Sequence, residues 1–276
     1  MLPPMSEQDD ALSDLQATRI VDGLRWAHRT TYRRVMADYD PDTGHDQALI
    51  GTHAYIVLQD RIDRVFSCRR FSVSTDDPDP NAGRDLLLAG ILQSEFEEMP
   101  VLPPGTVVRS DLNSSPGWQH KEWRWLLAGG HYRSSDNISW PEKSVTKQQV
   151  AKQHSADDRA LFSVDEAVGH VTEACDAPSP TASDTVVNTL ILAHSVDRDT
   201  GDTELFLGRP RYNEGGGYAW YWKTSLLSLP PGSAGGGGVP DPQQPPGPDA
   251  NDVSDAPVRL RPESDEAAAE DAGRQT

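Results

Sequence analysis

The sequence predicts an α+β fold, with amphipathic helices in its N-terminal part and antiparallel β-hairpins in its C-terminal part. Apolar residues recur at helical spacing before residue 100, and short apolar runs separated by turn residues follow residue 105. From residue 229 onward proline, glycine and acidic residues dominate. We therefore expect a flexible N-terminus (1–10), one globular domain (11–228, helix-rich over 11–99 and sheet-rich over 105–228), and a disordered tail (229–276).

Three helices are predicted before residue 100. Apolar side chains recur about every third or fourth position over residues 11–39, as on one face of a long helix. The polar run "DYDPDTGHD" ends this helix, and a second one follows through Leu58, Ile62 and Phe66, so the two form a helical hairpin. A third helix is predicted over residues 83–99. A further one is expected over residues 163–175, where Ser163 and Glu166 have the spacing of an N-terminal cap.

The predicted strands lie in the second half of the chain. One hairpin is expected around the turn "NSSPG", with "WQHKEWRWLLAG" as its second arm, and another joins "TVVNTLILAHSV" to "TELFLG". A last strand covers residues 218–222. Because strand side chains alternate between the two faces, we expect Trp123 and Trp125 to share a face. By the same rule Trp220 and Trp222 share a face and Tyr221 takes the other.

Composition limits the classes of partner. The chain has 43 acidic and 25 basic residues, a net charge of −18, which disfavours indiscriminate binding to nucleic acid or anionic lipid. A protein partner is therefore favoured over nucleic acid. No apolar run approaches the roughly 18 residues of a membrane helix, and the N-terminus lacks the pattern of a secretory leader. We expect a cytoplasmic protein without a membrane partner.

Cysteine and arginine usage give two further indications. Cys68 and Cys175 are the only cysteines, and they are too far apart in sequence to predict a disulfide framework. Arginine outnumbers lysine 20 to 5, which is typical of a bacterium with a GC-rich genome. Neither feature points to a particular chemistry.

The recognisable catalytic motifs are missing or incomplete. In "RYNEGGGYAWYWKTSLL" three glycines come before a Lys-Thr pair, but no glycine precedes Lys223 and a strand follows in place of a helix, so a phosphate-binding loop is not expected. "DTG" occurs twice and resembles the paired loops of aspartic proteases, but its neighbours are polar turn residues. The histidines form no metal-binding spacing, so no metal and no cofactor are expected.

A stripe of positive charge is the first candidate binding feature. Its members fall one turn apart on the first predicted helix or directly beside it: Arg25, Arg29, Arg33 and Arg34. Such a stripe can meet phosphate or an acidic partner. The alternative is that these side chains pair within the chain, with Asp60 and Asp63 of the second helix, or the acidic tail, as acceptors.

Aromatic side chains are the second candidate feature. Six of the seven tryptophans lie in the sheet-rich half of the chain. One face of the predicted strands should be core, and the other would be a contact surface if it is exposed. The candidate surface residues are Trp123, Trp125, Trp220, Tyr221 and Trp222.

These features favour a non-enzymatic binding or regulatory protein that engages a macromolecular partner through its aromatic or arginine-lined surface. The alternative is an enzyme acting on a nucleotide or nucleic acid. In that case Lys143, Lys147 and Lys152 would hold phosphate, while carboxylates such as Asp111 or Asp136 would hold a divalent metal. No motif supports this alternative.

The predicted domain boundary can be tested by truncation. Removing residues 229–276 should leave the melting temperature nearly unchanged, because the segment has too few apolar side chains to contribute to a core. Thermal unfolding of the full chain and of the fragment 1–228 checks this. A large drop in melting temperature would refute the boundary.

Overall fold

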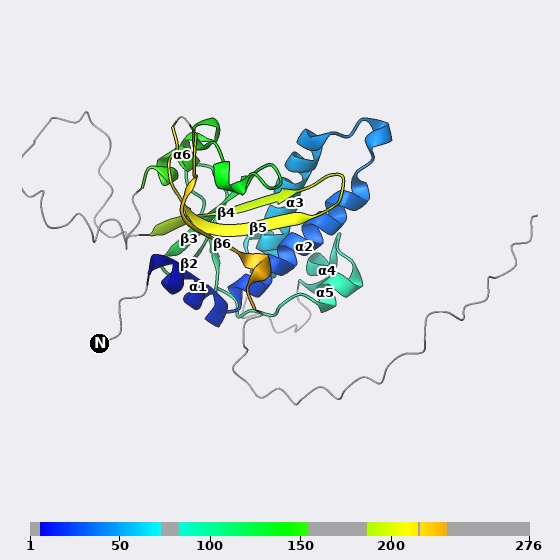
Figure 1. The fold of residues 1–276 in the computed structure, drawn as a ribbon. Helices are drawn as coiled ribbons and strands as arrows, with labels where there is room; N and C mark the ends of the chain where they lie inside the picture. Colours follow the sequence, from blue (N-terminus) through cyan, green and yellow to red (C-terminus); the bar gives the residue numbers. More distant parts are fainter. Residues whose placement is uncertain (1–5, 73–82, 154–186, 215, 231–276) are drawn as a thin grey trace, which may run out of the picture. The chain divides into compact units, whose positions relative to one another are not determined.

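The computed structural model describes residues 6–72, 83–153, 187–214 and 216–230. It confirms the predicted α+β class, with helices in the N-terminal part and a six-stranded mixed sheet in the C-terminal part (Figure 1). The helix expected over 163–175 lies outside the described residues, as does the predicted tail (229–276) except for Leu229 and Pro230. Leu229 is partly buried and packs against the core, so the ordered part of the chain extends slightly past the predicted boundary. None of the described helices has both the length and the apolar character needed to cross a membrane.

The helix predicted over 11–39 is divided into α1 (Glu7–Ala17) and α2 (Ile20–Asp38). The division falls at Arg19, whose φ of 59° is left-handed and interrupts the helical path. Just before it, the Thr18 hydroxyl donates to the carbonyl oxygen of Asp14 at 2.8 Å. The apolar periodicity of the sequence continues across the break, so it does not predict where one helix ends and the next begins.

The predicted helical hairpin is confirmed. The helices α2 and α3 (Gln47–Val65) pack against each other, and the short 3-10 turn η1 (Pro41–Thr43) lies in the loop that connects them. Asp46 caps α3 by accepting from the backbone N–H of Leu49 at 2.8 Å. A Cβ atom on Gly23 would lie 2.8 Å from the Phe66 ring, so glycine is what allows α2 this close approach.

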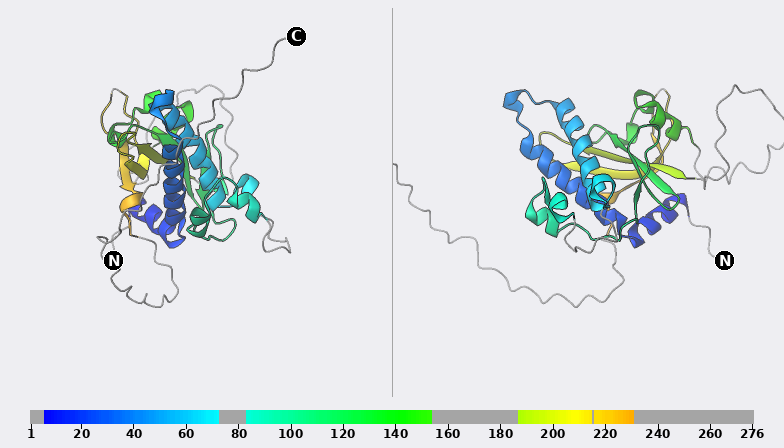
Figure 2. Two further views of the ribbon diagram at one scale, coloured as in Figure 1. Left: turned by 90° about the vertical axis from the view of Figure 1, so that its right-hand side faces the viewer. Right: turned by 180° about the vertical axis from the view of Figure 1, so that it is seen from behind.

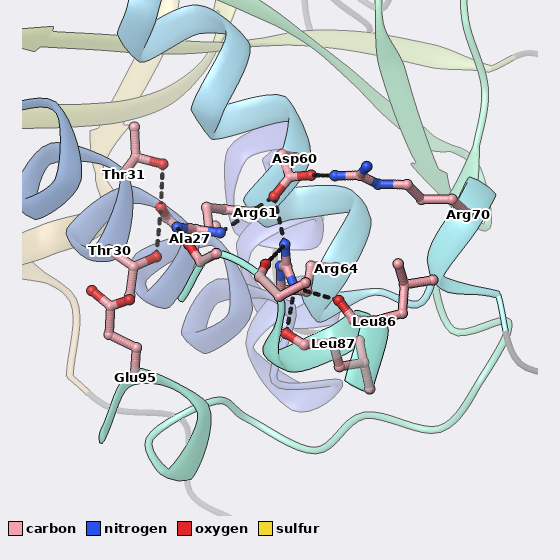
Figure 3. Close-up of polar contacts among 12 residues, drawn as sticks. Ala27, Thr30, Thr31, Asp60, Arg61, Arg64, Arg70, Leu86, Leu87 and Glu95 are labelled. Atoms are coloured by element: carbon pink, nitrogen blue, oxygen red, sulfur yellow. Dashed lines mark hydrogen bonds and ion pairs between the residues drawn. The ribbon is translucent and has the colours of Figure 1, made fainter. Parts of the chain in front are cut away.

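The helix predicted over 83–99 is also divided, into α4 (Arg84–Leu88) and α5 (Gln93–Glu97), with Gly90 at a φ of 75° between them. Two buried arginines of α3 hold this segment (Figure 3). Arg64 donates to the carbonyl oxygens of Leu86 at 2.9 Å and Ala89 at 3.0 Å, and Arg61 donates to that of Gly90 at 2.8 Å. These guanidinium groups bind carbonyls at and just after the C-terminal end of α4, where carbonyls have no partner within the helix.

The sheet has the strand order β1-β2-β3-β4-β5-β6, and every neighbouring pair is antiparallel except β3 and β4, which are parallel. The predicted hairpins are present, but the parallel pairing that joins them was not predicted. The strands are β1 (Val108–Arg109), β2 (Gly117–His120), β3 (Trp123–Gly129), β4 (Asn188–Val196), β5 (Thr203–Pro210) and β6 (Trp220–Ser225). The segment "WQHKEWRWLLAG" is itself a hairpin, since β2 turns into β3 within it.

Each face of the sheet has its own core. The α2–α3 hairpin covers one face (Figure 2), where its apolar residues pack with Leu127, Leu192 and Leu207. The opposite face packs Leu126 and Ile191 against Trp140 and Val150. These last two residues belong to the 3-10 turn η4 (Trp140–Glu142) and to α6 (Val145–Ala151), neither of which was predicted. Two further 3-10 turns in the C-terminal half are η3 (Ser135–Asn137) and η5 (Leu226–Ser228).

Strand β6 corrects one prediction about faces. Trp220 packs in the core on the α6 side, whereas Trp222 packs in the core on the α2–α3 side. The cause is a bulge: Arg209 pairs with Trp222 and Pro210 pairs with Trp220, which leaves Tyr221 without a register partner. A bulge inserts one extra residue, so the alternation of side chains shifts at this point.

A buried ion pair attaches α1 to the sheet beside this bulge. Arg209 is 1% exposed, and its Nε donates to Oε1 of Glu7 at 2.6 Å. Its Nη1 donates to the carbonyl oxygen of Thr189 at 2.9 Å. The first residue of α1 is thereby bonded to β5, and through Arg209 to β4.

Glu7→Ala should lower the free energy of unfolding by about 3–5 kcal/mol, because it leaves the Arg209 guanidinium buried without its carboxylate. Urea denaturation measures this, with the exposed Glu97→Ala as the matched control. The double variant Glu7→Leu/Arg209→Met removes both charges and should lose much less. A loss below about 1 kcal/mol for Glu7→Ala would contradict the structural role of this pair.

Candidate functional site

A cavity of about 690 Å³ lies where β3 and β4 end, beside α3. We call it the β3–β4 cavity and define it by Tyr32, Gly51, Tyr55, Gly130, Lys143 and His194, all of which line it. Its volume is in the range of sites for small organic ligands.

The parallel pairing of β3 and β4 creates this cavity. Gly129, the last residue of β3, pairs in register with His194, and the N–H of Gly130 donates to the carbonyl oxygen of His194 at 3.1 Å. Because the two strands run in the same direction, their carboxyl ends meet at one edge, where ligands commonly bind in sheets with parallel strands. An added Cβ atom at Gly51 or Gly130 would meet no atom within 4 Å, so both glycines border open space.

His194 is a buried, neutral histidine beside the cavity. It is 3% exposed, and its Nδ1 is 2.8 Å from the Tyr32 hydroxyl. Burial, followed by the nearby charges of His28, Lys147 and Lys143, lowers the pKa of His194 from 6.5 to about 3. Its Nε2 is buried and has no hydrogen-bond partner in the described part of the chain. Other buried nitrogens of the described chain, such as His120 Nε2, share this property, but His194 is the one among them that lines the cavity.

Lys143 reaches the cavity from the turn η4. This turn is fixed by Trp140, whose Nε1 donates to the carbonyl oxygen of Ala219 at 2.7 Å. The Lys143 Nζ then donates to the carbonyl oxygen of Gly129 at 2.9 Å, at the end of β3. Burial lowers the pKa of Lys143, and the charge of Glu142 opposes this effect.

Lys147 follows one turn later, on α6. Its Nζ lies 5.6 Å from the centre of the Tyr55 ring, a side chain that lines the cavity. Burial, followed by the charge of Lys143, lowers the pKa of Lys147. Two amines, a neutral histidine and two tyrosines therefore gather around one cavity.

The described lining of the cavity differs in charge from the chain as a whole. No Asp or Glu is among the described residues that line it, although the chain carries a net charge of −18. The adjacent carboxylate of Glu204 accepts from the Ser195 hydroxyl at 2.7 Å and from the N–H of Arg133 at 3.0 Å. It therefore already has two donors of its own.

The four predicted arginines each have a partner within the chain. Arg25 Nε donates to the carbonyl oxygen of Leu226 at 2.6 Å, and Arg34 Nε lies 2.7 Å from Oδ2 of Asp38. Arg25 also lines a second cavity of about 520 Å³, together with Arg29 and Arg33. The arginines therefore lie together on α2, as predicted.

The acceptors of this stripe differ from those expected. Arg33 pairs with Glu95 of α5 at 3.3 Å, and Arg29 pairs with Glu98, directly after α5, at 2.7 Å. Asp60 instead binds Arg64 at 2.9 Å. Asp63 binds Arg109 at 2.9 Å and accepts from the Trp118 Nε1 at 2.7 Å. Asp63 is buried and Asp60 is partly buried, and the arginines that pair with both carboxylates belong to elements other than α2.

The four predicted tryptophans are core residues and do not form a surface. Trp123, Trp125, Trp220 and Trp222 are at most 8% exposed. They pack in the cores on the two faces of the sheet, so these four tryptophans do not form an exposed aromatic surface. Tyr221 is half-buried, with its ring 6.0 Å from the Arg211 guanidinium carbon.

The residues of the alternative enzyme do not assemble into a metal site. Asp111 binds Arg69 at 2.7 Å and Arg109 at 2.5 Å, and Asp136 binds Lys223 at 2.8 Å. Over the described ranges, no group of three or more His, Cys, Asp or Glu is placed to hold a metal ion. Of the three lysines proposed for phosphate, Lys143 and Lys147 come together at the cavity, while Lys152 is exposed over the Tyr212 ring.

Sequence reasoning missed His194, Tyr32 and Tyr55 as site residues. Tyr32 and Tyr55 fall at apolar positions of the two predicted helices, and His194 stands in the apolar strand "TLILAHSV". A single histidine in such a strand was the available signal. Its partner Tyr32 lies 162 positions away, which no local pattern records.

Acidification should destabilise the fold through two buried histidines. Burial lowers the pKa of His28 to about 4, against a hydrogen bond to the carbonyl of Glu204, and that of His194 is about 3. The unfolded chain therefore binds more protons than the folded one below pH 6.5, and stability falls as pH drops from 6.5 towards 4. Each histidine should contribute about 1.4 kcal/mol per pH unit in this window.

Urea denaturation of the wild type, His28→Asn and His194→Gln across this range measures the slope. Each of these two substitutions should remove one histidine's contribution to the slope of unfolding free energy against pH. His131→Gln, at an exposed position, should keep the full slope. Equal slopes in all four proteins would contradict the assignment.

Comparison with protein-family models, with curated proteins and with solved structures gives no match for this chain. The geometry of the β3–β4 cavity is therefore the basis for a functional proposal.

Proposed function

We propose that the chain is a binding protein for a small organic anion, which it holds in the β3–β4 cavity. One observation carries the proposal: the cavity has Lys143 in its lining and Lys147 beside it, and none of its described lining residues is acidic. In a chain of net charge −18, a basic cavity selects anions locally against the repulsion of the surrounding surface.

The remaining lining fits the organic part of such a ligand. Tyr32 and Tyr55 offer aromatic surface, and Ala48 and Val196 offer aliphatic surface. Thr52 is a hydroxyl donor on the same α3 side of the cavity. Ligand sites commonly combine an apolar lining with a few polar groups that fix orientation.

A macromolecular partner for the arginine stripe stays a prediction. The burial of the four tryptophans and the pairing of Arg29 and Arg33 with carboxylates weaken this hypothesis relative to the cavity. The enzyme hypothesis that requires a metal is weakened in the same way, because Asp111 and Asp136 are paired with basic side chains.

Lys143→Ala should weaken anion binding by about 10- to 100-fold, the equivalent of one charge-assisted hydrogen bond of about 1.5–3 kcal/mol. Titration calorimetry with a panel of aromatic carboxylates and phosphates, including pyridoxine phosphate, measures it. Lys152→Ala is the matched control, since Lys152 is exposed at the end of α6. Its affinity should equal that of the wild type.

Gly51→Leu is an independent way to fill the cavity. Position 51 is in α3 and an added Cβ atom meets open space, so the variant should fold normally and exclude the ligand. If no anion of the panel binds the wild type more tightly than it binds Gly51→Leu, the proposed function is wrong.

A further inference from the structure

The two amines at the cavity differ from Lys121 and Lys223 in their ionic partners; Lys152 likewise has no ion pair within the described ranges, but it is exposed. Lys121 and Lys223 form ion pairs with Asp14 and Asp136. Within the described ranges, neither Lys143 nor Lys147 has a carboxylate at ion-pair distance. Two positive groups are thus held near each other, beside a cavity, without a negative partner.

We propose that Lys147 forms a reversible imine with the carbonyl group of a ligand in the β3–β4 cavity, so that the ligand is an aldehyde or ketone carrying a carboxylate or phosphate. The inference rests on the proposed function, because the anionic group of the ligand must first bind in the cavity beside Lys143.

Lys143 and Lys147 have different contacts, and we assign them different roles. The hydrogen bond from Lys143 Nζ to the carbonyl of Gly129 fixes its ammonium group at the end of β3, where it can hold an anion. Lys147 makes no such bond to any described residue, and its Nζ lies over the Tyr55 ring. Burial and the charge of Lys143 both favour the neutral form of Lys147, and a neutral amine is the form that attacks a carbonyl.

The reaction balances without an oxidant or reductant. The nitrogen lone pair of neutral Lys147 attacks the carbonyl carbon, and a proton passes from nitrogen to the carbonyl oxygen to give a carbinolamine. The second hydrogen of the nitrogen then leaves with the hydroxyl group as water, and a C=N bond remains. Hydrolysis reverses both steps and releases the ligand.

Lys152, the residue directly after α6, can be compared with Lys147 of the same helix. Its Nζ lies 4.5 Å from the centre of the Tyr212 ring, so it too rests on a tyrosine, but its side chain is exposed. The two lysines therefore differ in burial and in proximity to the cavity, more than in the kind of contact they make.

Pyridoxal phosphate is a suitable probe because it combines an aldehyde, an aromatic ring and a phosphate. The full-length protein is incubated with one equivalent at neutral pH, reduced with borohydride and mapped by peptide mass spectrometry. We expect about tenfold or more label on Lys147 than on Lys152, because a carbonyl bound beside an amine reacts at high effective concentration. Pyridoxine phosphate, which lacks the aldehyde, should compete with this labelling.

Variants separate the chemistry from the binding. Lys147→Arg keeps the positive charge and the contact with Tyr55, so it should bind pyridoxine phosphate like the wild type while losing the adduct. Lys152→Arg should keep both. Circular dichroism confirms that each variant is folded.

The outcomes distinguish the imine from the proposed function. If pyridoxine phosphate binds but label spreads evenly over the lysines, the imine is refuted and the anion site stands. Selective labelling of Lys143 would overturn the assignment to Lys147. If neither probe binds more tightly to the wild type than to Gly51→Leu, both the imine and the proposed anion site are refuted.

Discussion

The parallel pairing of β3 with β4 is the constraint on which the rest of this structure depends. It joins two antiparallel halves, β1-β2-β3 and β4-β5-β6, into one sheet. A parallel pair requires a connection that crosses over a face of the sheet, and the described part of that connection contains η4 and α6. The crossover therefore does two things at once: it covers the second face of the sheet, and it brings Lys143 and Lys147 to the edge where Gly129 pairs with His194.

Local patterns predict the pieces of this fold but not the way they join. Spacing of apolar residues predicts the α2–α3 hairpin, and turn chemistry predicts the hairpin of β4 and β5, because each depends on neighbours in sequence. The β3–β4 register pairs residues 65 positions apart, and the apolar spacing within each strand does not specify it. Helix breaks at Arg19 and Gly90 were missed for a related reason, since apolar spacing continues across both while the backbone conformation changes.

The candidate site was harder to predict than the fold. Alternation along a strand assigns Trp220 and Trp222 to one face, but it cannot anticipate a bulge that depends on the pairing of β5 with β6. Helical spacing predicts the arginine stripe on α2. It does not predict the acceptors Glu95 and Glu98, because these reach α2 only when the segment that contains α5 packs beside it. Lys143 and Lys147 could be named from sequence as phosphate ligands. Only the three-dimensional arrangement separates them from Lys152.

The cationic groups at the cavity differ from the buried arginines elsewhere in the described chain, because they have no carboxylate partner there. Elsewhere the chain gives its buried guanidinium groups carboxylate partners: Arg209 has Glu7, Arg64 has Asp60 and Arg109 has Asp63. Burying cations without such partners opposes folding, and the lowered pKa values of Lys143 and Lys147 reflect that cost. An anion in the cavity would relieve it, and a ligand that binds only the folded state adds its binding free energy to stability. Under the proposed function an anionic ligand supplies this negative charge, whether or not the ligand also reacts with Lys147.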